Sequence, residues 1–593
     1  MKKARKLTAV LLSLVMLLAL VIPASAAENY SITIHNDKEG HTYEAYQIFA
    51  GTVSSDEETN GETGGPMLGD ITWGSGVNGE TLLAALKAAD AQKYDACTTA
   101  ANVAEALGAE GATAADAAAF ADIAAKHLTE TVAGTADAPE GGNYVIEGLP
   151  AGYYLVKDSL QEDDNQTGQV LSDYIVQVLG NVTMDPKDSD IPTVLKKVYD
   201  EEFAQGDQTR TYGLGYNDVA DWDIGDNVPF KLIASVPDAT EIEAYDTYTY
   251  TFHDTLDAGL TLLQKDDQDQ TTFEIYFVND LTIDPRDQGF RYLDAEEYTP
   301  VVNGNSFTIT IDDLKTLQIT TAEGDQHPAT NYNYIVIFYD AVLNENAEIG
   351  LPGNENTAYL EFSNNPNGEG TGRTEEDTVI VFTYELDGTK VDGANHETTL
   401  EDAQFVLLNG AKTRVARVAN GKFVEWVEPD DIKDGLTGND TLKMGQLTKE
   451  DFINGGGLVI TSGADGIFKI AGLDDGTYFL REIQAPNGYN LLENDVELVI
   501  TADTANGQNW AGDPATALTA LNMTITVGEA GPTQVGGDLE GGTVGVTVEN
   551  NQGATLPETG GMGTTLFYII GVLLVVGAGV LLVVRIRMKA HNE

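Results

Sequence analysis

The apolar run near the C-terminus limits what this chain can be more than any other feature. Leu566 to Val584 is an uncharged apolar stretch, and Arg585, Arg587 and Lys589 follow it. At a helical rise of about 1.5 Å per residue, this stretch spans the roughly 30 Å hydrocarbon core of a bilayer. The cations favour the cytoplasmic side. The sequence therefore predicts a C-terminal transmembrane helix.

A second targeting segment occupies the N-terminus. Basic residues at positions 2, 3, 5 and 6 precede an apolar run from Leu7 to Ile22, and the small residues Ala24-Ser25-Ala26 follow. This order is that of a secretory signal peptide, and cleavage is expected after Ala26. We therefore expect an exported chain that is retained at the surface by its other end.

Composition limits the partners and the covalent chemistry. The chain has 593 residues, of which 94 are acidic and 32 are Lys or Arg, so its formal charge is −62. Such a surface repels nucleic acid and anionic lipid. Cys97 is the only cysteine, so an intrachain disulfide is excluded, although exported proteins commonly use disulfides as reinforcement. We expect Cys97 to be a structural thiol.

Hydrophobic patterning predicts a predominantly all-β chain. Residues 27–188 alternate as strands around an Ala-rich part, about 80–131, so we expect a β domain with a helical insertion. Segments rich in Pro, Asp, Asn and Gly then bound two domains, 189–373 and 374–553, whose short alternating runs predict immunoglobulin-like β-sandwiches. Residues 554–593 form the C-terminal segment. The expected architecture is a rod of tandem domains.

Directly before the apolar run stands the pentapeptide Leu556-Pro557-Glu558-Thr559-Gly560. In this position it resembles the cell-wall sorting signal of Gram-positive surface proteins. The resemblance implies that a sortase cysteine cleaves between Thr559 and Gly560 and keeps the Thr559 carbonyl as a thioester. A plain membrane anchor with a chance pentapeptide is the alternative.

A longer motif runs from Gly476 to Tyr489 and reads Gly-Thr-Tyr-Phe-Leu-Arg-Glu-Ile-Gln-Ala-Pro-Asn-Gly-Tyr. It resembles the E-box of backbone pilins of Gram-positive sortase-assembled pili, and the chain is similar to that family over almost its full length. The resemblance implies that Glu482 lies between a first-strand lysine, Lys390, and a last-strand asparagine, Asn550. It also implies a Lys–Asn isopeptide bond. A surface ion pair, with Asn550 in a turn, is the alternative.

The chemistry explains why these residue types are needed. A lysine amine attacks a carboxamide only when it is neutral, and burial favours the neutral amine. The same burial favours a protonated Glu482, which can bond to the Asn550 carbonyl and shuttle protons. Strand alternation agrees, because Val544, Val546, Val548 and Asn550 share one face.

The middle domain offers the same design without an E-box. Alternation favours Lys196 on its first strand and Asn364 on its closing strand as the bonding pair. Lys197 and Asn365 are the alternates if the register slips by one residue. Pilins of this type carry a strand carboxylate where Asp254 stands, so the resemblance implies Asp254 as the acid.

The end of the first domain carries Asp185-Pro186-Lys187. It resembles the Tyr-Pro-Lys pilin motif, with Asp in place of Tyr. The resemblance implies that the Lys187 amine attacks the Thr559 thioester of the next subunit. A solvated linker lysine is the alternative. Elsewhere in this domain Asp158 stands at the E-box acid position without the Ala-Pro sequence, and we expect no isopeptide bond there.

These features together predict a structural subunit of a covalent surface pilus, anchored to peptidoglycan. Expected partners are pilus-specific and housekeeping sortases, identical subunits, and accessory or tip pilins. A monomeric wall-anchored adhesin built from the same domains is the alternative. The sequence shows no Ser-His-Asp, metal-ligand or phosphate-loop pattern. We therefore expect no cofactor, no metal and no enzymatic activity beyond autocatalytic bond formation.

Overall fold

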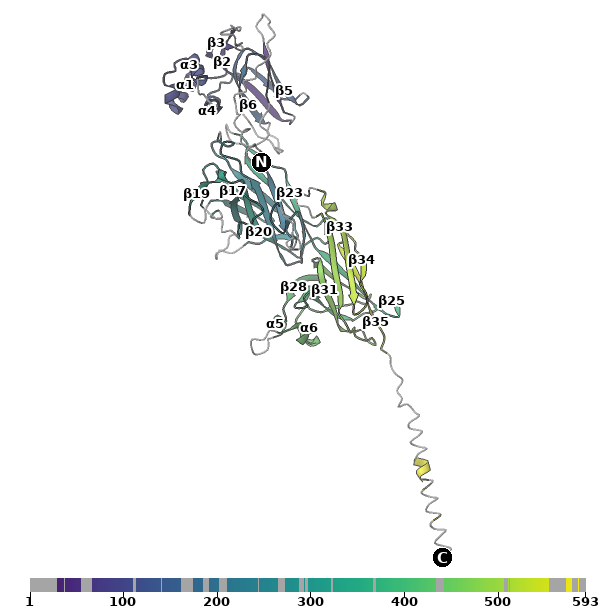
Figure 1. The fold of residues 1–593 in the computed structure, drawn as a ribbon. Coiled ribbons are helices and arrows are strands. Elements are labelled where there is room, and N and C mark those ends of the chain that lie inside the picture. The colour runs from purple at the N-terminus through teal and green to yellow at the C-terminus, as the bar shows by residue number, and fades with distance from the viewer. Residues whose placement is uncertain are drawn as a thin grey trace.

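The strands of the chain form three groups that follow one another along the molecule (Figure 1). They are named here the N-terminal unit (29–184), the middle unit (191–382) and the C-terminal unit (384–553). The computed structural model describes residues 29–36, 38–54, 67–109, 114–139, 141–160, 174–184, 191–201, 211–243, 245–264, 272–286, 293, 297–320, 324–365, 370–433, 442–505, 510, 512–553, 572–576, 578 and 585.

The N-terminal unit is a two-sheet β structure with a helical insertion, as expected. Its strands are β1 (Tyr30–His35), β2 (His41–Ser54), β3 (Met67–Trp73), β4 (Gly134–Ala136), β5 (Asn143–Leu149), β6 (Gly152–Leu160), β7 (Tyr174–Val178) and β8 (Val182–Met184). One sheet has the order β5-β1-β8, and the other has the order β3-β2-β6-β7 with β4 paired to β2. The core that contains Ile32, Tyr43 and Tyr154 is buried within this unit.

Four helices fill the connection between β3 and β4. They are α1 (Gly79–Ala89), α2 (Ala91–Tyr94), α3 (Ala100–Leu107) and α4 (Ala114–Ala125). The side chains of Asn78, Asp90 and Thr99 accept hydrogen bonds from backbone N–H groups in the first turns of α1, α2 and α3, and so cap those helices. The helices pack against Phe49 and Leu155 and lie to one side of the strands in Figure 1.

The middle unit is a sandwich of two sheets. Its elements are β9 (Val194–Tyr199), β10 (Tyr216–Asn217), β11 (Val219–Asp221), β12 (Asn227–Ser235), β13 (Tyr250–Leu256), β14 (Leu260–Leu262), β15 (Glu274–Val278), β16 (Thr299–Asn303), β17 (Ser306–Ile311), β18 (Gln318–Thr320), β19 (Gln326–Pro328), η3 (Ala329–Asn331), β20 (Tyr334–Leu343), β21 (Asn354–Ser363), β22 (Thr371–Arg373) and β23 (Asp377–Phe382). One sheet is β10-β9-β12-β20-β14 and the other is β11-β23-β21-β13-β17-β16.

Strand alternation builds the core between these sheets. Along β21, every second residue is buried, so Asn354, Asn356, Ala358, Leu360 and Phe362 face inward. The middle unit also extends past residue 373, where the sequence placed a boundary. There β23 pairs with both β21 and β11, so its sheet continues to Phe382. Alternation identifies a strand, but it cannot show which sheet the strand joins.

The C-terminal unit is a connected set of strands. Its elements are β24 (Tyr384–Asp392), β25 (Asn395–Thr399), β26 (Gln404–Asn409), β27 (Val415–Ala419), β28 (Lys422–Val427), α5 (Pro429–Ile432), η4 (Met444–Gln446), α6 (Lys449–Asn454), β29 (Ile460–Thr461), β30 (Ile467–Leu473), β31 (Gly476–Gln484), β32 (Val496–Thr504), η5 (Pro514–Thr516), β33 (Leu518–Val527), β34 (Thr533–Gly536) and β35 (Thr543–Asn550). The first strand, β24, pairs in parallel with the last, β35. Val544, Val546, Val548 and Asn550 are buried along β35, as alternation predicts.

The middle and C-terminal units meet through the segment that follows β11. The side chain of Asp223 accepts hydrogen bonds from Trp426 Nε1 at 2.7 Å and from the Asp474 backbone N–H at 2.8 Å. The Ile224 backbone N–H donates to the Gly472 carbonyl at 3.0 Å. These contacts link Asp223 and Ile224 of the middle unit to β28, to β30 and to the turn that follows β30. Burial raises the pKa of Asp223.

The same junction includes a close approach of two glycines. Gly350 and Gly542 both have positive φ, and a Cβ atom on Gly350 would lie 2.2 Å from the Gly542 backbone nitrogen. No side chain fits there without a shift of backbone. The two units are therefore packed backbone against backbone at this point.

Replacement of Trp426 by Phe is expected to destabilise the junction. The substitution removes one hydrogen-bond donor from the buried Asp223 carboxyl, which costs about 1–3 kcal/mol of unfolding free energy. Denaturant unfolding of the exported chain measures the loss. Trp510→Phe is the matched control, because the contact of Trp510 with Asp218 comes from its backbone N–H. Equal losses in both variants would contradict a specific role for the Trp426 hydrogen bond.

Candidate isopeptide-bond sites

The C-terminal unit brings together the three residues that the E-box resemblance selected. Lys390 on β24, Glu482 on β31 and Asn550 on β35 are all buried. Lys390 Nζ lies 3.4 Å from Glu482 Oε1, and Asn550 Nδ2 donates to Glu482 Oε2 at 2.9 Å. The acid therefore lies between the amine and the amide, as expected.

Strand register explains this placement. In the parallel β24–β35 pair, Lys390 lies opposite Val548 and Asp392 lies opposite Asn550, so the lysine and the asparagine are diagonal neighbours. The remainder of the E-box closes the site. The Leu492 backbone N–H donates to Glu482 Oε2 at 2.9 Å, and Asn550 Nδ2 also donates to the Asn490 carbonyl at 2.7 Å.

Three buried polar atoms at this site have no hydrogen-bond partner among the described residues. They are Lys390 Nζ, Glu482 Oε1 and the Asn550 carbonyl oxygen, Oδ1. A buried unpaired polar group is costly, so such a cluster needs an explanation. Burial lowers the pKa of Lys390 to about 8, which makes the neutral, nucleophilic amine accessible near physiological pH. The arrangement is that of an amine and a carboxamide that contact the two oxygens of one acid.

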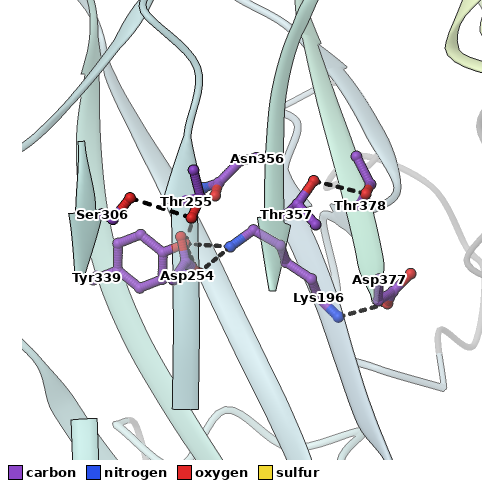
Figure 2. Close-up of polar contacts among 9 residues, drawn as sticks. All are labelled: Lys196, Asp254, Thr255, Ser306, Tyr339, Asn356, Thr357, Asp377 and Thr378. Atoms are coloured by element: carbon purple, nitrogen blue, oxygen red, sulfur yellow. Dashed lines mark hydrogen bonds and ion pairs between the residues drawn. The ribbon is translucent and has the colours of Figure 1, made fainter. Parts of the chain in front are cut away.

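The middle unit holds a second site of this kind. Lys196 on β9 and Asp254 on β13 are both buried, and Lys196 Nζ donates to Asp254 Oδ2. Tyr339 and Asn356 complete this site and are among the residues drawn in Figure 2. Lys196 Nζ also donates to the Tyr339 hydroxyl at 2.6 Å, and Asn356 Nδ2 donates to the same hydroxyl at 2.9 Å. Tyr339 comes from β20 and Asn356 from β21.

The lysine of this site shares a lowered pKa with Lys390. Burial lowers the pKa of Lys196 and raises the pKa of Asp254, so both shifts favour a neutral amine beside a neutral carboxyl. Asp254 Oδ1 and Asn356 Oδ1 are buried without a hydrogen-bond partner among the described residues. The carboxamide of Asn356 is therefore held by its nitrogen only.

The structure brings Asn356, and not the expected Asn364, to Lys196. Asp254 pairs with Ala358 on β21, and Asn356 is the next inward-facing residue. Asn364 follows the end of β21, eight residues from Asn356. At about 3.3 Å per residue this is roughly 26 Å along the strand, too far for a lysine to span. Asn356 and Asn364 are an even number of residues apart and are therefore expected on the same face, so alternation alone could not choose between them.

Of the two neighbouring lysines, the structure directs Lys196 and not Lys197 to the acid. Lys197 Nζ lies 2.5 Å from Asp218 and 3.7 Å from Asp377, on the opposite face of β9. Lys197 is therefore part of a separate buried ion pair. Asn365, the alternate asparagine, follows Asn364 and is one residue farther from the site in sequence.

The N-terminal unit has a different pair at the acid position. Asp158 on β6 lies 2.8 Å from His41 Nδ1 on β2, and both side chains are buried. The absence of an isopeptide bond from this unit stays a prediction. Cys97 is buried among the inserted helices, and its thiol donates to the Asn102 carbonyl at 3.5 Å, which suits a structural thiol.

Acidic side chains gather at the junction of the middle and C-terminal units. Carboxylate oxygens of Asp221, Asp474 and Asp475 lie within 4.8 Å of one another. Burial and repulsion by Asp221 and Asp223 raise the pKa of Asp474 well above its usual range. A raised pKa favours the protonated form of Asp474, which reduces the repulsion among these carboxyl groups.

Several sequence predictions fall outside the described residues. The pilin-motif lysine Lys187, the pentapeptide Leu556–Gly560 with Thr559, and the signal peptide are among them. Within the described part of the chain, no helix is both long enough and apolar enough to cross a bilayer.

Comparison with known families identifies two parts of the chain. A family model for the SpaA prealbumin-like fold domain matches residues 385–511, and a model for the LPXTG cell wall anchor motif matches residues 548–589. The first match contains Lys390 and Glu482, and the second contains Asn550 and the pentapeptide. The chain is therefore a cell-wall-anchored surface protein with a prealbumin-like domain, and its anchor implies attachment by a sortase.

Individual relatives are more distant. The trypsin-resistant surface T6 protein of Streptococcus pyogenes serotype M6 is 24% identical over 306 residues, which are 43% of this chain and 48% of that protein. The chain thus spans about half the length of the curated relative it matches. With both family models, this match confirms the resemblance to LPXTG-anchored backbone pilins.

Two solved structures are similar over most of the chain. The T6 backbone pilin of serotype M6 Streptococcus pyogenes is 15% identical with a TM-score of 0.48, and covers 90% of this chain and 100% of its own. The full-length major pilin SpaD from Corynebacterium diphtheriae is 16% identical with a TM-score of 0.41, and covers 90% of this chain and 99% of its own.

The pKa of Lys390 predicts the pH dependence of any acylation of its amine. The amine must be neutral, so the rate is expected to rise about tenfold per pH unit below 8 and to level off above it. The mature chain, synthesised in a cell-free system, is shifted to buffers between pH 6 and pH 9 and quenched in denaturant. Mass spectrometry then measures the peptide that links Lys390 to Asn550. A rate that is flat or falling from pH 6 to pH 8 would contradict the assignment.

Proposed function

We propose that the chain is the repeating structural subunit of a covalent surface pilus, stiffened by self-generated isopeptide bonds and finally anchored to peptidoglycan. The observation that carries the proposal is the buried Lys390–Glu482–Asn550 group, which ends nine residues before Thr559 of the sorting pentapeptide. An internal cross-link next to the point of covalent attachment suits a chain that bears load through that attachment. The name of the T6 relative, a trypsin-resistant surface protein, also suits a cross-linked chain.

The bond-forming reaction in the C-terminal unit uses atoms already in place. The neutral Lys390 Nζ attacks the side-chain carbonyl carbon of Asn550, and the carbonyl electron pair moves to Oδ1. Glu482 accepts a proton from the attacking nitrogen and delivers one to Nδ2. The carbon–Nδ2 bond then breaks and ammonia leaves. Amine and carboxamide thus give a secondary amide and ammonia, and Glu482 ends as it began.

The middle unit supports a second bond, between Lys196 and Asn356, with Asp254 as the acid. The support is the network in Figure 2, in which the amine and the amide nitrogen share the Tyr339 hydroxyl. The reaction again releases ammonia. In both units the lysine belongs to the first strand, so each bond joins the start of the unit to one of its late strands.

Polymerisation would use the two ends that the bonds reinforce. A pilus-specific sortase cysteine would hold the Thr559 carbonyl as a thioester after the loss of Gly560. The Lys187 amine of another copy would attack that carbonyl, forming an amide and releasing the sortase thiol. A housekeeping sortase would transfer the last subunit to peptidoglycan. Identical subunits and accessory or tip pilins would be the partners.

Intact mass tests the internal bonds. The mature chain is expected about 34 Da below its sequence mass, because each of two bonds releases ammonia, about 17 Da. Asn550→Ala and Asn356→Ala should each remove one deficit. Asn364→Ala is the matched control and should keep both, because Asn364 lies away from Lys196. If Asn364→Ala removed a deficit and Asn356→Ala did not, the assignment of Asn356 would be wrong.

Surface extracts test polymerisation. Cells that express the chain with its sortases should give a ladder of detergent-resistant multimers, and Lys187→Ala should reduce the ladder to one band. Lys443→Ala, at an exposed lysine, is the control and should leave the ladder intact. A single band from the unsubstituted chain would instead support the monomeric adhesin. A ladder that survives Lys187→Ala would show that another nucleophile makes the joint.

A further inference from the structure

The two candidate sites solve the same proton-transfer problem with acids of different length. In the C-terminal unit, Glu482 reaches the leaving amide directly, because Asn550 Nδ2 donates to Glu482 Oε2 at 2.9 Å. In the middle unit, Asp254 has one methylene fewer. Asn356 Nδ2 donates to the Tyr339 hydroxyl, and that hydroxyl donates to Asp254. Among the described residues, no hydrogen bond joins Asp254 directly to Asn356 Nδ2.

The Tyr339 hydroxyl lies at the centre of the middle-unit site. It accepts hydrogen bonds from Lys196 Nζ at 2.6 Å and from Asn356 Nδ2 at 2.9 Å, and it donates to Asp254 Oδ2 at 2.8 Å. It therefore contacts the attacking nitrogen, the leaving nitrogen and the acid at once, as Figure 2 shows.

Packing fixes this hydroxyl in place. The Tyr339 ring is stacked on Phe230 at a centroid distance of 5.4 Å and meets Phe307 edge to face at 4.9 Å. Tyr339 is 2% exposed, so its hydroxyl is held among side chains and not in bulk water. Such a hydroxyl costs free energy to bury and is retained where its hydrogen bonds are used.

We propose that Tyr339 is a catalytic residue of the middle-unit bond, and that its hydroxyl relays the proton from Asp254 to the leaving nitrogen of Asn356. The inference rests on the proposed Lys196–Asn356 bond. It assigns to this chain a four-residue site in the middle unit and a three-residue site in the C-terminal unit. The shorter side chain of Asp254 requires the additional hydroxyl, whereas the longer side chain of Glu482 does not.

The proton count of the step balances. Lys196 Nζ forms a bond to the Asn356 carbonyl carbon and gives one proton to Asp254 Oδ2, the oxygen to which it donates a hydrogen bond, as that oxygen passes its own proton on. The Asp254 Oδ2 proton passes to the Tyr339 oxygen as the Tyr339 proton passes to Asn356 Nδ2. The carbon–Nδ2 bond breaks, and ammonia leaves with the bonding pair. Asp254 and Tyr339 are regenerated.

The raised pKa of Tyr339 agrees with this role. Burial is the main cause and the neighbouring Asp254 adds to it, so the side chain keeps its proton and can donate it. A relay of this kind acts as a general acid and base, which typically contributes 10²–10⁴-fold to a rate.

The test follows both bonds in one chain. The mature full-length chain is synthesised in a cell-free system as the natural sequence, Tyr339→Phe and Tyr250→Phe, and quenched over time. Peptide mass spectrometry then quantifies the Lys196–Asn356 and Lys390–Asn550 links. Tyr250 is the matched control, a buried tyrosine of the same core whose hydroxyl donates to the Ser235 carbonyl.

Tyr339→Phe is expected to slow the Lys196–Asn356 link about 100-fold or more, with the Lys390–Asn550 link unchanged. Tyr250→Phe is expected to leave both rates unchanged. If the Lys196–Asn356 link formed in Tyr339→Phe as fast as in the natural sequence, the proposed relay would be wrong, although the bond itself would be confirmed. If the natural sequence formed only the Lys390–Asn550 link, the proposed middle-unit bond would fail, and the relay with it.

A second variant separates catalysis from folding. Difluorotyrosine at position 339 keeps the ring packing and makes the hydroxyl more acidic. The relay predicts an altered rate and a shifted pH profile for the Lys196–Asn356 link only. An unchanged rate and profile would overturn the proposal, whether or not Tyr339→Phe folds.

Discussion

A lysine amine placed in an apolar core is the constraint on which both sites depend. A charged ammonium group taken out of water costs several kcal/mol, even after relaxation of its surroundings. Lys196 and Lys390 are nevertheless each 0% exposed. The burial is tolerable only if the amine is neutral, paired with an acid, or converted to an amide. At each site a buried acid is the partner of the lysine, and conversion of the amine to an amide would remove the cost of burying a charge permanently.

The strand order gives these bonds their mechanical meaning. In the C-terminal unit β24 and β35 are parallel neighbours, and Lys390 and Asn550 lie on them near the same end. A pull on the tail after β35 would otherwise shear this ladder of hydrogen bonds. An amide between the two strands would pass the load directly to β24, which follows the last strand of the middle unit. The junction through Asp223 and the paired glycines adds non-covalent contacts at the same boundary.

The proposed reaction would run at the two sites with acids of different length. The longer Glu482 both accepts from the amide and faces the amine, so no intermediary is required. The shorter Asp254 faces the amine, and the hydroxyl of Tyr339 covers the remaining distance to the amide. The aromatic rings that exclude water from the site also hold that hydroxyl in position.

The sequence by itself indicated the C-terminal anchor, the predominantly β fold and the helical insertion, and the resemblance of Gly476–Tyr489 to the pilin E-box indicated the group of Lys390, Glu482 and Asn550. These features depend on local order along the chain, such as an apolar run, a period of two or a recognisable motif. Tertiary structure alone decided that Asn356 and not Asn364 shares the Tyr339 hydroxyl with Lys196, and that β23 belongs to the middle unit. The physical reason is register. Alternation tells which face a side chain occupies, but the position along that face is set by strands paired across about 60 to 160 residues of chain.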